Sequence, residues 1–312
     1  MSMISESDKI SVRYYTNTYD PPELNSHMFI EDFGRNIVPV YGSKSEVVTC
    51  KLEPDSKDAM KSLYELLPSN REHYRPSFND IIIETIEYMA QHLVNSGFLV
   101  LELVKYKNVN EREFYKLELI YGKEIKIKKD TITQIIHDDV AKELGTNKID
   151  IPVEKCFVIE FPKSLGGKEK YLEFLKDFRE LANLSPMMNF LNNPLQMQAN
   201  YNINEHQRLY DRELWKKTKL SSWHHRSYGD GKISGYYHIY RHLLFRKNKI
   251  KLRDYIVEEL CKIILTLSEM VLGQKAELKI QGLMSIDKVE EKLAQWKNRR
   301  HMKKPCYIVL FQ

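Results

Sequence analysis

The stretch SFNDIIIETIEYMAQHLVNSGFLVLELVKYK, residues 77–107, decides how the first half of the chain folds. Ser77 is a typical helix N-cap, and Gly97 stands where a helix C-cap is expected. Between them, apolar residues recur every three or four positions, as on one face of a helix: Phe78, Ile82, Ile86, Met89 and Leu93. The apolar run that opens Phe98–Lys107 is typical of a central strand. We therefore predict that a helix over Ser77–Ser96 packs on a sheet begun by Phe98–Lys107.

The rest of the first half alternates between strands and helices. Short apolar or alternating runs predict strands over Lys9–Tyr15, Glu46–Leu52, Phe114–Tyr121, Glu124–Lys128, Thr131–Ile136 and Cys156–Phe161. Helical periodicity or capping residues predict helices over Met28–Val38, Asp55–Leu67, Asp139–Leu144 and Lys168–Leu184. Tyr121-Gly122-Lys123 is a plausible hairpin turn. The first half is therefore expected to be strand-rich around one long helix.

The second half has a different character, beginning with a poorly periodic connector near Ser185. Beyond it, helices are predicted over Asn204–Lys219, Gly235–Phe245, Leu252–Leu272 and Ser285–Arg300. Two terminal strands, Ala276–Ile280 and Cys306–Phe311, are expected to pair with each other. The prediction is an α+β protein with a mixed domain over residues 1–184 and a mainly helical, basic domain over residues 185–312.

Composition narrows the class of protein. Of the 312 residues, 42% are hydrophobic and 29% are charged, which excludes global disorder. No apolar run approaches the roughly 18 residues of a membrane span, and the start MSMISESDKI predicts no signal peptide. Four widely spaced cysteines predict neither a zinc site of the CxxC type nor a disulfide framework. We expect a soluble cytoplasmic protein with no membrane partner and no cofactor.

Positive charge is concentrated in residues 216–253, which hold eleven Lys or Arg and one acidic residue, Asp230. This segment carries a net +10, while the rest of the chain carries −5. Aromatic residues are interleaved with the cations, a combination that suits phosphates and exposed bases. We predict contact with nucleic acid, DNA rather than RNA, through Lys216, Lys217, Lys219, Trp223, Arg226, Arg241, Arg246, Lys247, Lys249, Lys251 and Arg253. A solvated surface with core tyrosines is the plain alternative.

Two other functions stay open. His238 and His242 are four residues apart on an expected helix, as a pair of metal ligands requires, and His224 is a candidate third ligand. A metal-dependent nuclease or phosphodiesterase is therefore an alternative, although the zincin pattern HExxH is missing. The third hypothesis is a protein-interaction module of a mobile-element or defence system, whose basic face binds a protein.

Residues 66–161 resemble the wing region of tailed-phage portal proteins. The similarity is carried by Leu-Leu-Pro-Ser-Asn at 66–70, Phe78-Asn-Asp and the long helix, then Gly97-Phe-Leu-Val-Leu-Glu-Leu-Val, Ile151-Pro-Val-Glu and Val158-Ile-Glu-Phe. Ser96-Gly97-Phe98 stands where the family has Gly-Asn-Ala. The resemblance implies a ring-forming, non-enzymatic homo-oligomer of phage or prophage origin that handles double-stranded DNA.

Overall fold

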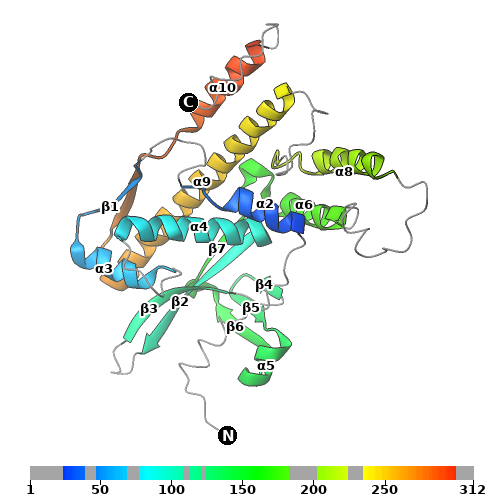
Figure 1. Ribbon diagram of the computed structural model, residues 1–312. Helices are drawn as coiled ribbons and strands as arrows, with labels where there is room; N and C mark the ends of the chain where they lie inside the picture. The colour runs from blue at the N-terminus through cyan, green and yellow to red at the C-terminus, as the bar shows by residue number, and fades with distance from the viewer. Residues whose placement is uncertain are drawn as a thin grey trace.

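A computed structural model describes residues 24–38, 47–68, 77–107, 113–120, 124–182, 202–223 and 235–299 (Figure 1). The fold is α+β, as predicted: antiparallel strands lie mostly in the first half and helices dominate the second. The expected strands Lys9–Tyr15 and Cys306–Phe311, the hairpin turn at Tyr121 and most of the connector lie outside the described residues. No helix in the described ranges combines the length and the apolar character that a membrane span needs.

Helix α4 (Phe78–Ser96) and strand β2 (Phe98–Lys107) form where the sequence predicts them. Ser77 and Asp80 make a reciprocal capping box, in which each side chain accepts a hydrogen bond from the other residue's backbone N–H. Gly97 ends the helix with φ +75°, and a Cβ there would lie 3.1 Å from the Leu172 side chain. The turn therefore favours glycine both by conformation and by space.

Strand β2 is the centre of a three-stranded antiparallel sheet, in the order β3 (Glu113–Leu119), β2, β7 (Cys156–Glu160). Both faces of β2 are buried. Leu99 and Leu101 belong to the main core under the helices, whereas Val100 belongs to a second, smaller core. This two-sided burial explains the continuous apolar run at the start of the strand.

The smaller core is closed by a second antiparallel sheet, β4 (Glu124–Ile127), β5 (Thr131–Ile135) and β6 (Lys148–Pro152). Ile132 and Ile151 lie directly opposite each other in this sheet and pack toward Val100 of β2. The short helix α5 (Asp138–Leu144) joins β5 to β6. Its N-cap is His137, whose side chain makes no capping hydrogen bond. The sequence analysis did not assign β6.

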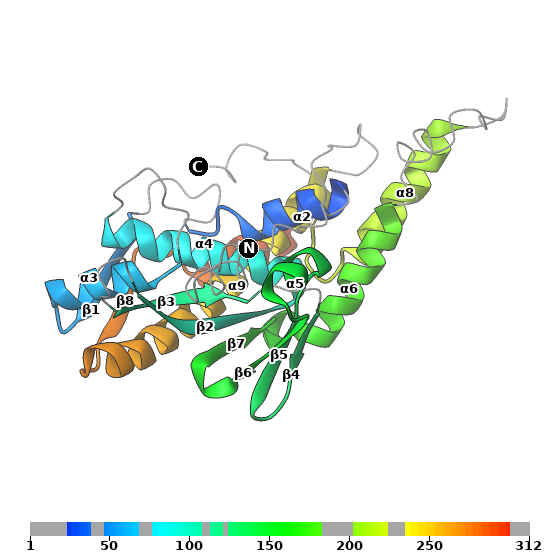
Figure 2. The ribbon, with the colours of Figure 1, turned by 90° about the horizontal axis from the view of Figure 1, so that it is seen from below.

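Helices cover the face of the β3–β2–β7 sheet that is opposite the smaller core. Helices α2 (Leu24–Gly34), α3 (Lys57–Leu66) and α4 pack with α6 (Gly167–Ala182) around α9 (Gly235–Leu272), while α8 (Ile203–Lys217) lies against α6 on the outside (Figures 1 and 2). The main core draws on nearly all of these helices. Residues on both sides of position 184 share it, so the expected division into two domains does not separate two hydrophobic cores.

Helix α9 corrects the expectation of two helices with a break between Phe245 and Leu252. It is continuous over 38 residues, a length of about 57 Å at 1.5 Å per residue. The polar run between the two apolar stripes suggested a loop. Within that run, however, Lys249 and Ile250 are buried. Because the buried lysine donates its hydrogen bonds to a neighbouring segment, the helix passes through the run without a break.

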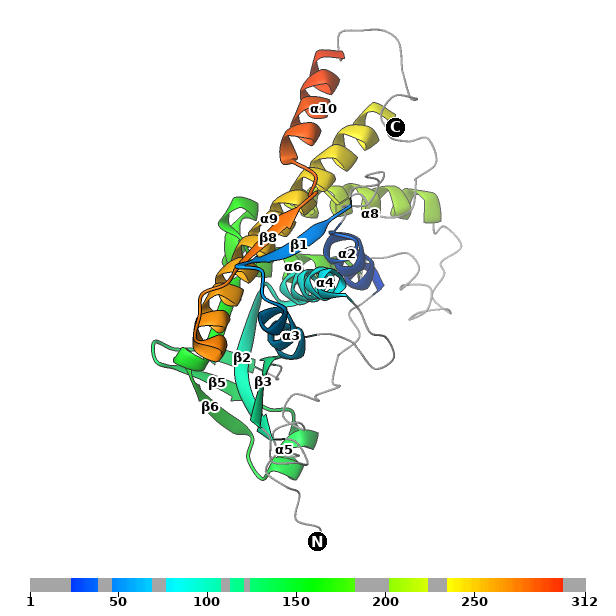
Figure 3. The ribbon, with the colours of Figure 1, turned by 90° about the vertical axis from the view of Figure 1, so that its left-hand side faces the viewer.

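Strands β1 (Thr49–Glu53) and β8 (Glu277–Gln281) form an antiparallel ribbon beside α9 (Figure 3). The sequence analysis expected β8 to pair with Cys306–Phe311. In the described residues β8 pairs with β1, so that Leu52 lies opposite Leu278 and both side chains enter the main core, while Cys306–Phe311 lies outside the described residues. The Asn79 side chain accepts a hydrogen bond from the N–H of Cys50, and Cys261 donates one to the carbonyl of Leu278. After the ribbon, helix α10 (Ile286–Arg299) packs against α9.

We expect Ile86→Asp to prevent folding, because Ile86 is fully buried in α4 and the new carboxylate would lose its hydration without gaining a partner. That cost is several kcal/mol, comparable to the whole stability of a typical domain. Soluble yield and circular dichroism measure it. Glu84→Asp is the control, because Glu84 is exposed on the same helix and Asp there should cost well under about 1 kcal/mol. A well-folded Ile86→Asp protein would contradict the packing.

Candidate nucleic-acid interface

The cations of residues 216–253 do not form one surface. Arg241, Lys249 and Arg253 of α9 are almost completely buried, with 6%, 5% and 1% of their surface exposed. Arg226 and His224 lie outside the described residues. The prediction that Arg241, Lys249 and Arg253 contact nucleic acid is therefore wrong, because each makes its hydrogen bonds inside the protein.

Arg241 holds the end of α8. Its guanidinium donates hydrogen bonds to the carbonyls of Trp215, at 3.1 Å, and Trp223, at 2.8 Å, and to the hydroxyl of Thr218. Thr218 is the C-cap of α8, and the last carbonyls of a helix have no partner within it. A buried cation at this end also interacts favourably with the helix dipole. Arg241 thus joins the start of α9 to the end of α8.

Lys249 does the same for α2. Its Nζ donates hydrogen bonds to the carbonyl oxygens of Asp32, at 2.8 Å, and Arg35, at 2.6 Å, where α2 ends. Burial lowers the pKa of Lys249 from its ordinary 10.5 to about 8, although the nearby Asp32 and Glu87 carboxylates act in the opposite direction. The lysine therefore joins two helices but carries a desolvation cost while it is charged.

Arg253 and Arg246 face the segment between β8 and α10. Arg253 Nη2 donates hydrogen bonds to the carbonyl of Met284, at 2.6 Å, and to the carboxylate of Asp254. Arg246 is half-buried, and its Nη2 lies 3.5 Å from the Met284 sulfur. Both arginines thus contact Met284, just before α10 begins.

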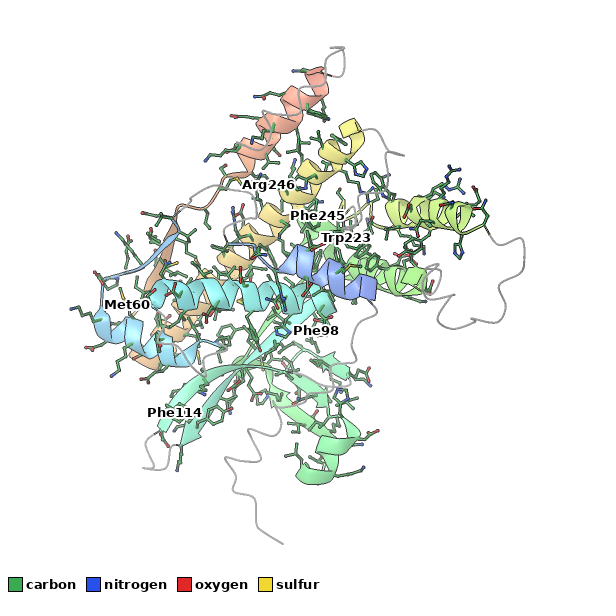
Figure 4. The ribbon with its side chains drawn as sticks, viewed as in Figure 1. Met60, Phe98, Phe114, Trp223, Phe245 and Arg246 are labelled. Atoms are coloured by element: carbon green, nitrogen blue, oxygen red, sulfur yellow. The ribbon has the colours of Figure 1, made fainter. Side chains whose placement is uncertain are left out.

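Trp223 is buried with 1% of its surface exposed, so the prediction that a base stacks on it is wrong. Its ring makes edge-to-face contacts with Phe29 of α2 and Phe178 of α6, at centroid distances of 5.7 and 5.4 Å. Its Nε1 donates a hydrogen bond to the Asp32 carboxylate at 2.9 Å. Trp223 and Phe245 lie where α2 and α6 meet α9 (Figure 4), so both are core residues.

The remaining described cations of the segment fall into two groups. Near the end of α8, Lys216 pairs with Glu213, Lys217 pairs with Asp177 of α6, and Lys219 is exposed. On α9, Lys247 pairs with Glu290 of α10, and Lys251 is half-buried. The two groups therefore lie beside different helices, α6 for the group near the end of α8 and α10 for Lys247.

Helix α8 carries a stripe of cations and one aromatic ring that the sequence analysis missed. Arg208, Arg212 and Trp215 are spaced by four and three residues, which places them on one helical face, and Lys219 follows one turn later. The arginines and Lys219 are exposed and Trp215 is half-buried. We call these four residues the α8 stripe. Arg208, Arg212 and Trp215 precede residue 216, where the basic segment begins, so a count of charge within that segment did not include them. Their helical spacing could have identified them.

Acidic side chains near the stripe are partly occupied by other partners. Glu213 accepts a hydrogen bond from Lys216 at 2.7 Å, and Asp211 accepts one from Gln207 at 2.8 Å. Glu205 lies 3.7 Å from Arg208, an exposed pair of the kind that contributes little to stability. The arginine can therefore exchange Glu205 for a phosphate at small cost. Helix α8 stands at the periphery of the molecule, which leaves the stripe accessible (Figure 1).

The histidines do not assemble a metal site within the described ranges. His238 is half-buried and lies edge-on to Trp215, with ring centroids 5.5 Å apart, and His242 is half-buried one turn further on. Among the described residues, no group of three His, Cys, Asp or Glu side chains is placed to hold a metal ion. The structure therefore offers the pair no third ligand in that part of the chain.

No protein-family model matches the sequence, and a search among curated proteins finds no match either. Among the described residues, the α8 stripe combines exposed cations with a half-buried aromatic ring where the basic segment begins.

We expect the stability of the protein relative to its Lys249→Met variant to rise as the pH increases from about 8 to 10. Below pH 8 the lysine is charged in both folded and unfolded chains, so the desolvation cost is fully present. Between about 8 and 10.5 only the folded chain releases the proton, which removes up to about 1.4 kcal/mol of that cost per pH unit.

Urea unfolding at a series of pH values measures this difference. Lys251→Met is the matched control, because Lys251 is half-buried two residues away and should show a much smaller change. A stability difference between wild type and Lys249→Met that stays constant from pH 7 to 10 would show that the ammonium group is hydrated.

Proposed function

We propose that the protein is a non-enzymatic structural or assembly component that binds nucleic acid through the α8 stripe and the basic segment that follows it. The observation that carries this proposal is the exposure of Arg208 and Arg212 on one face of a peripheral helix, next to the half-buried Trp215, with Lys219 exposed in the turn that follows. In sequence, Arg226 and Lys232 extend the same positive charge.

Electrostatics supports a polyanion as the ligand. Exposed cations spaced by one helical turn neutralise successive phosphates, and each contact releases a condensed counterion. Arginine adds a planar fork that grips a phosphate through two hydrogen bonds. The three buried cations of α9 contribute nothing to this surface, so we expect fewer phosphate contacts than the net charge of the segment implies.

The resemblance of residues 66–161 to portal wing regions supports the assembly part of the proposal. A portal-like ring handles double-stranded DNA and works in a host cell or in a virion, which agrees with the predicted location. Multi-angle light scattering tests this part. We expect a particle many times the mass of one chain, and a monomer across the accessible concentration range would reject the ring but leave nucleic-acid binding to be tested separately.

The binding part is tested by reversing three charges of the stripe. Arg208, Arg212 and Lys219 changed together to Glu should abolish most binding to fluorescent DNA at 50 mM salt, measured by anisotropy. For the wild type, log affinity should fall with log salt by about 0.7–0.9 for each phosphate contacted, giving a slope of about −2.8 to −4.5 for four or five contacts.

The matched control changes Lys126, Lys128 and Lys129 to Glu. These exposed residues lie on and just after β4 and give the same change in net charge on another surface. We expect this control to keep most of the wild-type affinity. Equal losses in both triple variants would mean that net charge, not the stripe, governs binding. A wild type that binds no nucleic acid at 50 mM salt would favour a protein as the partner of the basic face.

A further inference from the structure

We propose that the face of α9 that holds α10 also accepts α10 from a second copy of the chain, so that copies assemble by exchanging this helix. This inference rests on the assembly part of the proposed function and names the surface that carries it. In the described part of the chain, the extensive contacts of α10 are with α9. The helix stands at the edge of the molecule beside the first half of α9 (Figures 1 and 3).

A small core of its own attaches α10 to α9. Its buried side chains are Leu243 and Ile250 of α9, Met284 just before α10, and Val289 and Leu293 of α10. None of them belongs to the main core. Separating the two helices therefore uncovers few apolar side chains and leaves the main core closed. Local opening of this kind needs less free energy than unfolding of the whole protein.

An ion pair adds charge complementarity to this contact. Lys247 Nζ on α9 lies 2.5 Å from a carboxylate oxygen of Glu290 on α10, and 25% of the lysine side chain is exposed. The α9 face therefore fits an amphipathic helix that carries a carboxylate next to its apolar stripe. A second copy of the chain carries the identical helix, so exchange makes between two chains the contacts that the structure shows within one.

The connection between β8 and α10 is short and comprises residues 282–285. Gly282 approaches the Val47 carbonyl so closely that a Cβ would not fit, and the Met284 carbonyl accepts a hydrogen bond from Arg253. Arg253 Nη1 is buried and has no hydrogen-bond partner among the described residues. An unpaired buried donor costs free energy, so the corner at which the chain turns into α10 is strained. Short connections under strain favour exchange of the element that follows them.

Exchange from each copy to the next produces a head-to-tail contact. Such contacts form a closed ring when the rotation between copies closes, and an open chain when it does not. Because the helix contacts are the same in both states, the balance between monomer and assembly depends on the connection and on protein concentration. We therefore expect the assembly to form in a concentration-dependent way.

The ion pair itself provides the test. On the full chain, a water-soluble carbodiimide activates the Glu290 carboxylate, and the Lys247 amine then forms an amide while the carbodiimide leaves as a urea that carries the displaced oxygen. Between chains, this amide gives covalent multimers on a denaturing gel, and mass spectrometry identifies the joined peptides. Lys247→Arg keeps the charge but cannot form the amide, so we expect the multimers to disappear in this variant.

Lengthening the connection provides a second measurement. An insertion of about four Gly and Ser residues between Met284 and Ser285 relieves the turn, so α10 should return to its own α9. Light scattering should then give the mass of one chain, and the Lys247–Glu290 amide should form only within chains. The same insertion after Gly145, in the exposed turn between α5 and β6, is the control and should leave the assembly unchanged.

Two outcomes separate this inference from the proposed function. Particles larger than one chain in which the Lys247–Glu290 amide forms only within chains, or which survive the insertion unchanged, would overturn the exchange and leave the assembly standing. A wild type that stays a monomer at every accessible concentration would overturn the exchange and the ring together. Nucleic-acid binding is decided separately by the charge reversal of the α8 stripe.

Discussion

Hydrogen bonds from the side chains of α9 to backbone carbonyls at the ends of its neighbours organise the protein. Arg241 bonds the end of α8, Lys249 bonds the end of α2, and Arg253 bonds the carbonyl of Met284 before α10. Asn248 adds bonds to the carbonyls of residues 220 and 221. Helix ends leave carbonyls without partners, and a buried end needs donors from elsewhere. One helix supplies these donors and thereby sets the position of three others.

Positively charged residues therefore have two different roles in this structure. A cation whose hydrogen bonds are satisfied by carbonyls is part of the interior, and removing it would leave buried acceptors without donors. A cation on a peripheral helix keeps its hydration and remains available to a ligand. Residues 216–253 contain both kinds, so the net charge of the segment overstates how much of its positive charge is exposed. Besides its internal hydrogen bonds, Arg241 makes a cation–π contact with the ring of Trp215.

Local signals made part of the fold predictable. Ser77, Gly97 and the apolar stripe between them define α4 without reference to any distant residue, and the strand that follows carries its own apolar run. Long-range contacts were not predictable in this way. Within the polar run of α9, Lys249 donates hydrogen bonds to carbonyls where α2 ends, and the partner of β8 lies more than 200 residues away. The α8 stripe was missed because charge was counted along the sequence, whereas Arg208, Arg212 and Trp215 are neighbours only on a helix.

The pairing of β1 with β8 also affects how the chain acquires its structure during synthesis. Proteins are made from the N-terminus, so residues 49–53 emerge long before residues 277–281, which are their partner strand in the described part of the chain. Until then Leu52 lacks the apolar neighbour opposite it, and helix α9, which completes the main core, is also missing. Contacts of such sequence separation form slowly and leave apolar strand surface open to other chains. The nascent chain therefore passes through a period in which residues 49–53 are exposed to aggregation.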